Sequence, residues 1–324
     1  MRLHKLSSLA LACPLLCASV PAWSQAYLVK PIRLIVQGPP AGGADVIARP
    51  VAQRMSESMG QPLLIDNRPG AGGVVASVAV AASPPDGYTL LLATASGFSI
   101  APFLLKKRPY DPVNDFVAVT MLATAPMMVT VHPALPVRSV KELIALARAR
   151  PRDLLYASNG VGSFSHLTTE VFSRAAGITM THVPHKGGTP AVIDTVSGNV
   201  QVVITALPTL LTQVKAGRLR ALAVTSSSRS PAVPELPTVA ESALRGFESV
   251  QWYGIFAPRN TPAAIAARLH AEFRKAGESP AVKAPLALEG AALVMSEPQA
   301  MADFLKTDVA KWQKVISETN MVLE

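Results

Sequence analysis

The sequence predicts an α/β protein in which parallel strands are covered by helices on both faces. Short apolar runs alternate with stretches of helical periodicity along most of the chain, a pattern typical of βαβ units and parallel sheets. Each run ends in a turn rich in Gly, Pro, Asn or Ser. The 324 residues, of which 49% are hydrophobic, provide enough apolar surface for a large core and two lobes.

The first unit shows the pattern most clearly. The apolar run 34–36 leads into a Pro/Gly-rich turn, after which Ile47, Val51, Met55 and Met59 recur every four residues, as on one face of a helix. The turn matches neither a dinucleotide-binding fingerprint nor a Walker loop. A strand, a glycine turn and a helix start nevertheless form the parts of a phosphate or carboxylate cradle.

The same arrangement returns along the chain. Further strand–turn or strand–turn–helix units are predicted at 62–82, 88–104, 153–177, 178–198 and 200–217. Because ligands bind at the carboxyl ends of parallel strands, two facing sheets would line one cleft with these turns. Hydroxyl groups that we expect near such a cleft belong to Thr94, Ser96, Ser158, Ser163, Ser165 and Thr205.

Several helix ends carry recognisable signals. Ser139 with Glu142, and Thr238 with Glu241, fit the capping-box spacing. Thr189 before Pro190 predicts an N-cap followed by proline at the first helical position. Gly177 predicts a helix C-terminus.

The N-terminus predicts export. Arg2 and Lys5 precede the apolar stretch 6–20, and the small residues at 24–26 suit a signal peptidase. We therefore expect a signal peptide at 1–26, cut before Tyr27. A membrane anchor is the alternative, but the apolar run is short and interrupted by prolines. A lipoprotein is the second alternative, although neither cysteine has a convincing lipobox.

Both cysteines, at 13 and 17, fall inside this segment, so the mature chain would contain none. A cysteine-free exported protein suits the bacterial periplasm. The formal charge of +9 becomes +9 − 2 = +7 when Arg2 and Lys5 are removed. No basic block suggests a nucleic-acid partner, and the diffuse positive charge favours anionic ligands.

The residues also carry a resemblance to a known family. The chain resembles the tripartite tricarboxylate transporter receptors, also called Bug-type extracytoplasmic solute receptors, over essentially its whole mature length. The resemblance rests on the stretches KPIRLIVQGPPAGGAD, NRPGAGG, PDGYTLLLA, YDPVNDF, YASNGVGSFSHL, HVPHKGGTPAVID, AGRLRALAVTSSSRS, LPTVAES and WYGIFAP.

This resemblance implies a two-lobed periplasmic binding protein, a type II-like Venus flytrap with parallel-rich sheets, flanking helices and two crossovers. The crossovers would lie near 122–131 and 252–257. Lobe 1 would comprise 27–124 and 254–324, and lobe 2 would comprise 125–253. The implied function is capture of a small organic acid by a monomer that delivers it to a separate membrane permease, without enzymatic activity, metal or cofactor.

The resemblance also implies a set of ligand-binding residues. In lobe 1 the family's loop maps onto 40–45, where Ala41 and Ala44 replace a more common glycine or hydroxyl residue. In lobe 2 a small-x-Gly-x-Gly-Ser-x-x-His motif maps onto 158–166, and His185 stands where the family usually has tyrosine. The expected ligand-binding residues are Pro40, Ala41, Gly42, Gly43, Ala44, Asp45, Gly72, Gly73, Ala95, Ser96, Ser158, Gly160, Gly162, Ser163, His166, His185, Lys186, Gly187, Thr205 and Ala206.

Other interpretations stay open at this point. Asp45 could satisfy helix-start amides itself instead of leaving them for a ligand. His166 and Glu170 share a helix face, but a metal site needs a third ligand. Ser163 and His166 together suggest an exported hydrolase as an alternative function, and a ligand sensor without transport is a third. Trp252 and Tyr253 could pack in a hinge or stack on a ligand, and we favour packing.

Overall fold

The computed structural model describes residues 27–319 and confirms the predicted α/β fold. The predicted signal peptide, residues 1–26, lies outside the described residues. The strands are β1 (Ile32–Val36), β2 (Leu63–Asn67), β3 (Thr89–Thr94), β4 (Phe116–Val131), β5 (Leu155–Ser158), β6 (Thr181–Pro184), β7 (Val202–Ala206), β8 (Arg220–Val224), β9 (Val250–Pro258) and β10 (Ala292–Leu293).

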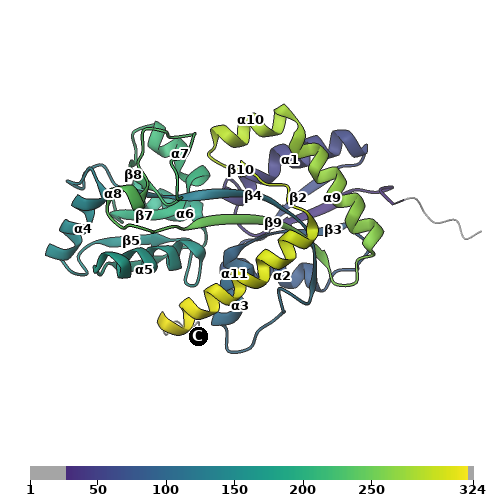
Figure 1. Ribbon diagram of the computed structural model, residues 1–324, viewed down its shortest axis with the longest axis horizontal. Helices are drawn as coiled ribbons and strands as arrows, with labels where there is room; N and C mark the ends of the chain where they lie inside the picture. Colours follow the sequence, from purple (N-terminus) through teal and green to yellow (C-terminus); the bar gives the residue numbers. More distant parts are fainter. Residues whose placement is uncertain (1–26, 320–324) are drawn as a thin grey trace, which may run out of the picture.

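Helices cover both faces of these strands (Figure 1). The α-helices are α1 (Gly43–Met59), α2 (Val74–Ala81), α3 (Ala101–Leu104), α4 (Val140–Ala149), α5 (Phe164–Ala176), α6 (Gly188–Val196), α7 (Leu207–Lys215), α8 (Val239–Ser242), α9 (Ala263–Glu278), α10 (Pro280–Leu288) and α11 (Pro298–Thr319). Two short irregular helices, η1 (Ala71–Gly73) and η2 (Ser96–Ile100), follow β2 and β3.

The described strands form a sheet in the order β2-β1-β3-β9-β4-β7-β5-β6, with β8 and β10 paired to β4. The outer strands of each half are parallel: β1 pairs with β2 and β3, and β5 pairs with β6 and β7. In contrast, β9 and β4 run antiparallel to their neighbours. Each lobe therefore combines a parallel region with a crossing antiparallel strand.

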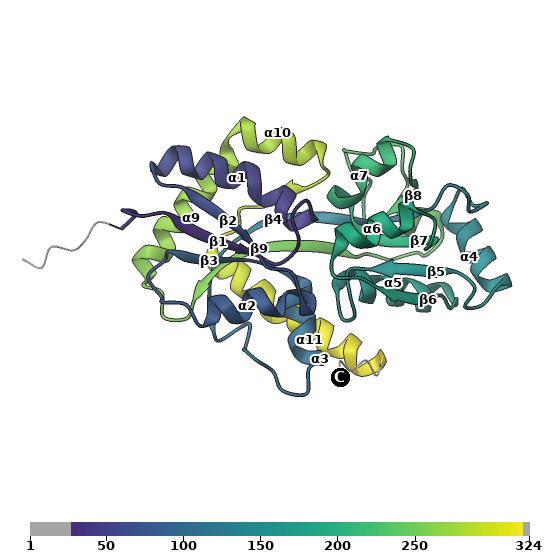
Figure 2. The same ribbon diagram turned by 180° about the vertical axis from the view of Figure 1, so that it is seen from behind.

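The two lobes are joined by β4 and β9 (Figures 1 and 2). β4 pairs with β9 from Phe116 to Pro126 and with β7 from Met127 to Val131. These two strands contain the stretches at which we expected the crossovers. The lobe boundaries at 124/125 and 253/254 stay a prediction.

The hydrophobic core differs on the two faces of the sheet. On the face covered by α2, α5 and α11, one cluster runs through both lobes and includes Phe98, Trp252 and Phe172. On the opposite face, separate clusters lie under α1, with Ile47 and Met55, and under α7. The lobes therefore share an apolar base on one side of the sheet.

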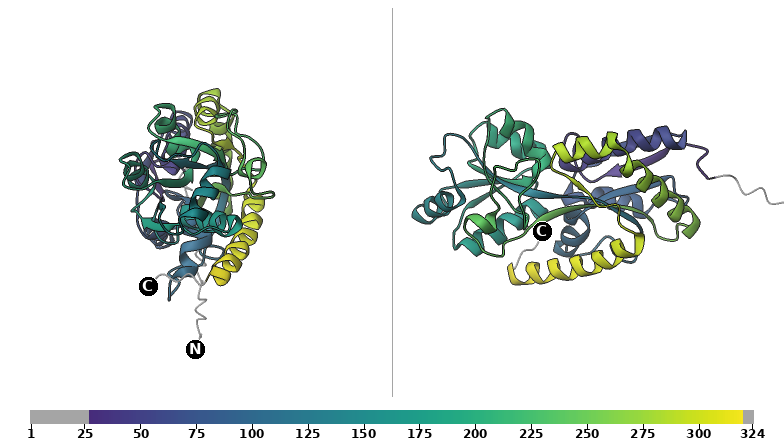
Figure 3. Two further views of the ribbon diagram at one scale, coloured as in Figure 1. Left: turned by 90° about the vertical axis from the view of Figure 1, so that its left-hand side faces the viewer. Right: turned by 45° about the horizontal axis from the view of Figure 1, so that its top comes forward.

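α11 extends along the first lobe towards the second (Figure 3). Its Trp312 packs edge-on against Phe164 of α5, with ring centroids 5.3 Å apart. The buried carboxylate of Asp308 accepts hydrogen bonds from Ser99 Oγ, from Trp252 Nε1 at 2.8 Å and from Trp312 Nε1 at 3.2 Å. Asp308 thus ties α11 to η2 and to the crossing strand β9.

Local signals in the sequence explain most helix ends. Thr238 and Glu241 form the predicted reciprocal capping box, and Gly177 ends α5 in a left-handed conformation. Ser139 caps α4 by accepting from Glu142 N. The expected cap at Thr189 is wrong, because α6 begins at Gly188 and Gly187 occupies the cap position without a side-chain hydrogen bond.

Replacing Asp308 tests the tie between α11 and β9. Asp308→Ala would leave three buried donors without their acceptor, and we expect a loss of unfolding free energy on the order of 3 kcal/mol. Asp308→Asn keeps an acceptor oxygen and the same shape, so its loss should be smaller. Urea unfolding measures both. A loss of less than about 0.5 kcal/mol in Asp308→Ala, the range of ordinary surface changes, would contradict the role of this carboxylate.

Candidate functional site

A cavity of about 400 Å³ lies between the lobes. Its walls come from the turns after β1, β2 and β3 in the first lobe and after β5, β6 and β7 in the second, and its floor comes from β4 and β9. The lining residues include Gln37, Gly38, Pro39, Gly42, Gly43, Ala44, Pro69, Gly72, Gly73, Thr94, Ser96, Leu105, Met127, Asn159, Gly160, Ser163, His185, Lys186, Gly187, Thr205, Ala206, Thr209, Gln251 and Tyr253. Such a volume suits a small molecule.

Helix starts from both lobes surround this cavity. α1 and α2 begin at the first-lobe turns, while α5, α6 and α7 begin at the second-lobe turns. The first N–H groups of a helix have no partner within the helix and carry partial positive charge. Most of the remaining wall is glycine or apolar, so the cavity offers amide donors without a cluster of charged side chains.

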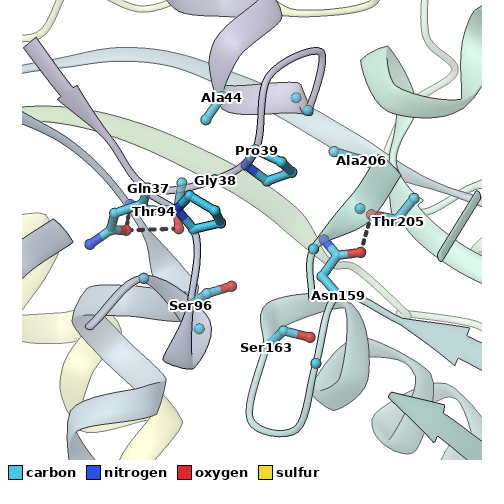
Figure 4. Close-up of a pocket in the computed structure, with 18 of the residues that line it drawn as sticks. Gln37, Gly38, Pro39, Ala44, Thr94, Ser96, Asn159, Ser163, Thr205 and Ala206 are labelled. Carbon is cyan, nitrogen blue, oxygen red and sulfur yellow. Dashed lines mark hydrogen bonds between the residues drawn. The ribbon is translucent and has the colours of Figure 1, made fainter. Parts of the chain in front are cut away.

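Gln37 holds the first-lobe wall together. Its Oε1 accepts from Thr94 N at 2.8 Å and from Thr94 Oγ1 at 3.1 Å (Figure 4). Its Nε2 donates to Ser77 Oγ at 2.6 Å. A Cβ atom on Gly73 would lie 2.8 Å from Gln37 Cδ, and one on Gly97 would lie 2.3 Å from Gln37 Nε2. Glycine at these two positions therefore leaves space for the buried amide.

The lobes contact each other across the cavity. Ser96 Oγ, in the first lobe, accepts from Phe164 N at the start of α5 at 2.8 Å. Ser96 projects from the first lobe toward the second (Figure 4). A Cβ atom on Gly187 would lie 2.9 Å from Pro39 Cδ, so the second-lobe turn packs closely on the first-lobe turn. The structure therefore describes a closed arrangement of the lobes.

Thirteen of the expected ligand-binding residues line the cavity. The lining residues are Gly42, Gly43, Ala44, Gly72, Gly73, Ser96, Gly160, Ser163, His185, Lys186, Gly187, Thr205 and Ala206. Whether any of them contacts a ligand stays a prediction. Lys186 is an exposed side chain beside the cavity, and His185 Nε2 lies 3.0 Å from Asp194 Oδ2.

The other seven expected residues lie outside the lining: Pro40, Ala41, Asp45, Ala95, Ser158, Gly162 and His166. Asp45 is buried beneath the first turn, where its carboxylate accepts from Ala41 N at 2.9 Å and from Arg49 Nε at 2.8 Å. These hydrogen bonds hold the pKa of Asp45 below its ordinary value, although burial opposes them. Asp45 thus stabilises the turn, in which Ala41 has a φ of +58°.

His166 and Ser158 hold the second-lobe turn from below. His166 Nδ1 accepts from Gly162 N at 3.1 Å, and Ser158 Oγ lies 2.6 Å from His182 Nε2. The two imidazole rings stack with centroids 3.9 Å apart, and Tyr156 stacks on His182. Burial lowers the pKa of His166 to about 4, and burial together with the neighbouring His166 lowers that of His182 to about 4.

This geometry does not form the serine–histidine pair that a hydrolase would need. Ser163 Oγ accepts from the backbone N of His166, and the His166 ring bonds to Gly162 instead. Ser158 does approach His182, but Ser158 is fully buried and outside the cavity lining. Among residues 27–319, no three His, Cys, Asp or Glu side chains gather as a metal site requires.

Several lining residues were not among the expected ligand-binding residues, including Asn159, Met127 and Tyr253. Asn159 accepts from Thr205 Oγ1 at 3.2 Å, and Met127 and Tyr253 form part of the floor. Met127 and Tyr253 lie in long apolar strands, so their pattern predicts core packing. Trp252 does pack as expected, whereas Tyr253, its neighbour in β9, faces the cavity.

Comparison with known proteins identifies the family. A family model described as "Tripartite tricarboxylate transporter family receptor" matches residues 47–321. The chain belongs to this family. The receptor is 36% identical to the protein BugT of Bordetella pertussis over 307 residues, which are 94% of each chain.

Solved structures are similar over most of the receptor. The R. palustris protein Rpa4515, solved with adipate, is 36% identical and superposes with a TM-score of 0.88 over 91% of this chain and 98% of its own. MatC from Rhodopseudomonas palustris, solved with bound malate, is 30% identical with a TM-score of 0.84 over 89% and 99% of the respective chains. Within residues 27–319 of the receptor, no helix has both the length and the apolar character needed to cross a bilayer.

The stacked histidines predict a pH dependence of stability. Their folded pKa values of about 4 lie below the ordinary 6.5, so the unfolded chain binds more protons in between. We expect full stability above pH 6.5 and a progressive loss of unfolding free energy down to about pH 4. His166→Asn keeps an acceptor for Gly162 N without titrating and should flatten this loss in urea unfolding at several pH values. An identical slope in both proteins would contradict the assignment.

The close approach of Gly187 to Pro39 predicts that the lobes can close only because glycine has no side chain. Gly187→Ala would place a methyl group against Pro39 and hold the lobes apart, so we expect weaker ligand binding and a larger radius of gyration in solution scattering. Gly217→Ala is the matched control, because Gly217 also has a positive φ, of +68°, but nothing lies near it. Gly217→Ala should lose roughly 1 kcal/mol of stability from left-handed strain. Gly187→Ala should lose about 1–3 kcal/mol, because φ +125° with ψ 176° is a nearly glycine-only conformation. Only Gly187→Ala should lose affinity. Equal affinities in the two would refute the closure contact.

Proposed function

We propose that this receptor captures a small organic acid between its lobes in the periplasm and delivers it to a separate membrane permease. The observation that carries the proposal is the cavity of about 400 Å³ into which helix starts from both lobes project. An anionic group is stabilised at such helix starts by N–H groups and by the helix dipole. Adipate and malate, present in the two similar structures, are acids of suitable size.

The charges around the cavity support an anionic ligand. Lys186 brings a positive charge to the cavity lining. The carboxylate of Asp45, near the start of α1, lies outside the lining and is neutralised by Arg49. A carboxylate moved from water into a closed cavity needs hydrogen bonds to most of its oxygen lone pairs. Ser96, Ser163 and Asn159 supply side-chain groups for that purpose, and the helix starts supply amides.

Periplasmic location, a permease partner and the absence of catalysis complete the proposal. The location rests on the predicted signal peptide and on membership of the receptor family. The permease partner and the non-enzymatic role rest on the same family. A hydrolase receives no support from the arrangement of Ser163 and His166 described above. A sensor without transport would bind in the same way and would differ only in leaving uptake intact.

Binding of organic acids tests the proposed function. The purified mature protein would be titrated calorimetrically with succinate, adipate, malate, benzoate and glutamate, and with succinamide as an uncharged comparison. At a hundredfold excess over Kd, a bound acid should raise the unfolding free energy by about 2.7 kcal/mol, which a thermal shift detects. We expect at least one acid to bind and succinamide to bind more weakly. If none of the acids binds or stabilises the protein, the proposal is wrong.

Transport requires its own measurement. In a strain that lacks the receptor, uptake of the radiolabelled acid that binds should fall and should return when the receptor is supplied. Unchanged uptake would favour the sensor.

A further inference from the structure

Tyr253 places a phenol group at the floor of the cavity. The residue belongs to β9, where it pairs with Thr94 of β3 on one side and with Ala123 of β4 on the other. Only 2% of its surface is exposed. The crossing strand thus holds the ring rigidly, while the side chain lines the space between the lobes.

The phenol oxygen lies where two helix starts meet. A Cβ atom on Gly43, the first residue of α1, would lie 2.9 Å from Tyr253 Oη, 3.1 Å from Thr209 Oγ1 and 3.4 Å from Ala206 Cβ. Ala206 and Thr209 belong to the start of α7 in the second lobe. The phenol is therefore close to the N-termini of α1 and α7, and the absence of a side chain at Gly43 makes this approach possible.

The hydroxyl of Tyr253 is exceptional among the five tyrosines of the chain. Tyr27 donates to Gly87 O, Tyr110 donates to Gly97 O, and Tyr156 donates to Glu170. Tyr88 Oη accepts from Leu28 N at 2.9 Å. Within residues 27–319, Tyr253 Oη has no hydrogen-bond partner. Because Tyr253 lines the cavity, its hydroxyl is free to donate to a molecule bound there.

The protonation state suits a hydrogen-bond donor. Burial raises the pKa of the Tyr253 phenol above its ordinary value, because the charged phenolate is poorly solvated there. The oxygen therefore keeps its proton at neutral pH. With the amides of two helix starts and the hydroxyl of Thr209 nearby, this end of the cavity is rich in donors. Helix N-termini also disfavour a positively charged group.

We propose that Tyr253 is a positioning residue that donates its hydroxyl hydrogen to a carboxylate oxygen of the bound acid, in a subsite completed by the N-termini of α1 and α7 and by Thr209. This inference rests on the proposed function and deepens it. The end of the ligand that enters this subsite must carry acceptor oxygens, so an ammonium group is excluded there.

The subsite also couples binding to closure. Gly43 comes from the first lobe, Thr209 from the second, and Tyr253 from the strand that connects them. The donors surround one point only when the lobes are together. A carboxylate that binds all of these donors makes more contacts in the closed arrangement than in an open one. It therefore stabilises the closed arrangement.

Tyr253→Phe tests the proposal because it removes the hydroxyl and keeps the ring. Succinate, adipate, malate and benzoate would be titrated calorimetrically into the wild type and the variant. A hydrogen bond to a charged group is worth enough that we expect Kd to rise about tenfold or more for each acid that binds. The melting temperature of the ligand-free protein should stay the same, because this hydroxyl makes no hydrogen bond to residues 27–319 that the variant would lose.

Two further variants separate positioning from structural effects. Thr209→Val removes the second-lobe hydroxyl at similar volume and should also weaken binding of the same acids. Tyr88→Phe is the matched control, since Tyr88 lies outside the cavity and its hydroxyl is used within the chain. It should lower the melting temperature and leave Kd unchanged.

The outcomes are distinguishable. Equal Kd values for the wild type and Tyr253→Phe would overturn the inference and leave the proposed function intact. A lower melting temperature of ligand-free Tyr253→Phe with unchanged Kd would show a purely structural role and would also overturn it. If neither these four acids nor glutamate binds the wild type, the proposed function is wrong and this inference fails with it.

Discussion

Pairing between β4 and β9 is the constraint on which the rest of the structure depends. The two strands run through the junction of the lobes and are hydrogen-bonded to each other from Phe116/Pro258 to Pro126/Val250. Side chains alternate between the faces of a strand, so Gln251 and Tyr253 face the cavity while Trp252 faces α11. One register therefore places both the floor of the site and the anchor of the C-terminal helix.

Close approach of the lobes follows from turns that lack side chains. Gly187 faces Pro39, and Gly43 faces Tyr253 and Thr209, with no room for a methyl group at either position. Because these glycines also begin α6 and α1, the same residues that permit contact bring helix N-termini to the cavity. Closure and electrostatic attraction of an anion thus depend on one feature of the chain, the glycine turn after a strand.

The sequence allowed the fold to be predicted more fully than the site. Alternating strands and helices follow from apolar periodicity, and the capping box at Thr238 follows from residue spacing. Both could therefore be predicted from short stretches of sequence. The positions of Gln37 and Tyr253 at the site could not be predicted in this way. Gln37 ends an apolar strand and Tyr253 lies within one, and such residues resemble core residues until the arrangement of the two lobes is known. The N-cap predicted at Thr189 was wrong because Gly187 already occupies the cap position of α6.

The residues expected at the site fall into two groups, according to whether their polar atoms already form hydrogen bonds within the protein. Asp45 and His166 bond to the backbone of their own turns and fix the shape of those turns. Ser96 accepts from Phe164 N, which fixes its oxygen between the lobes. Side chains that satisfy their own turns give up ligand contact and instead keep the remaining amides aligned. Preorganised donors of this kind need no rearrangement when an anion arrives, so the loss of its hydration is offset by groups that are already in position.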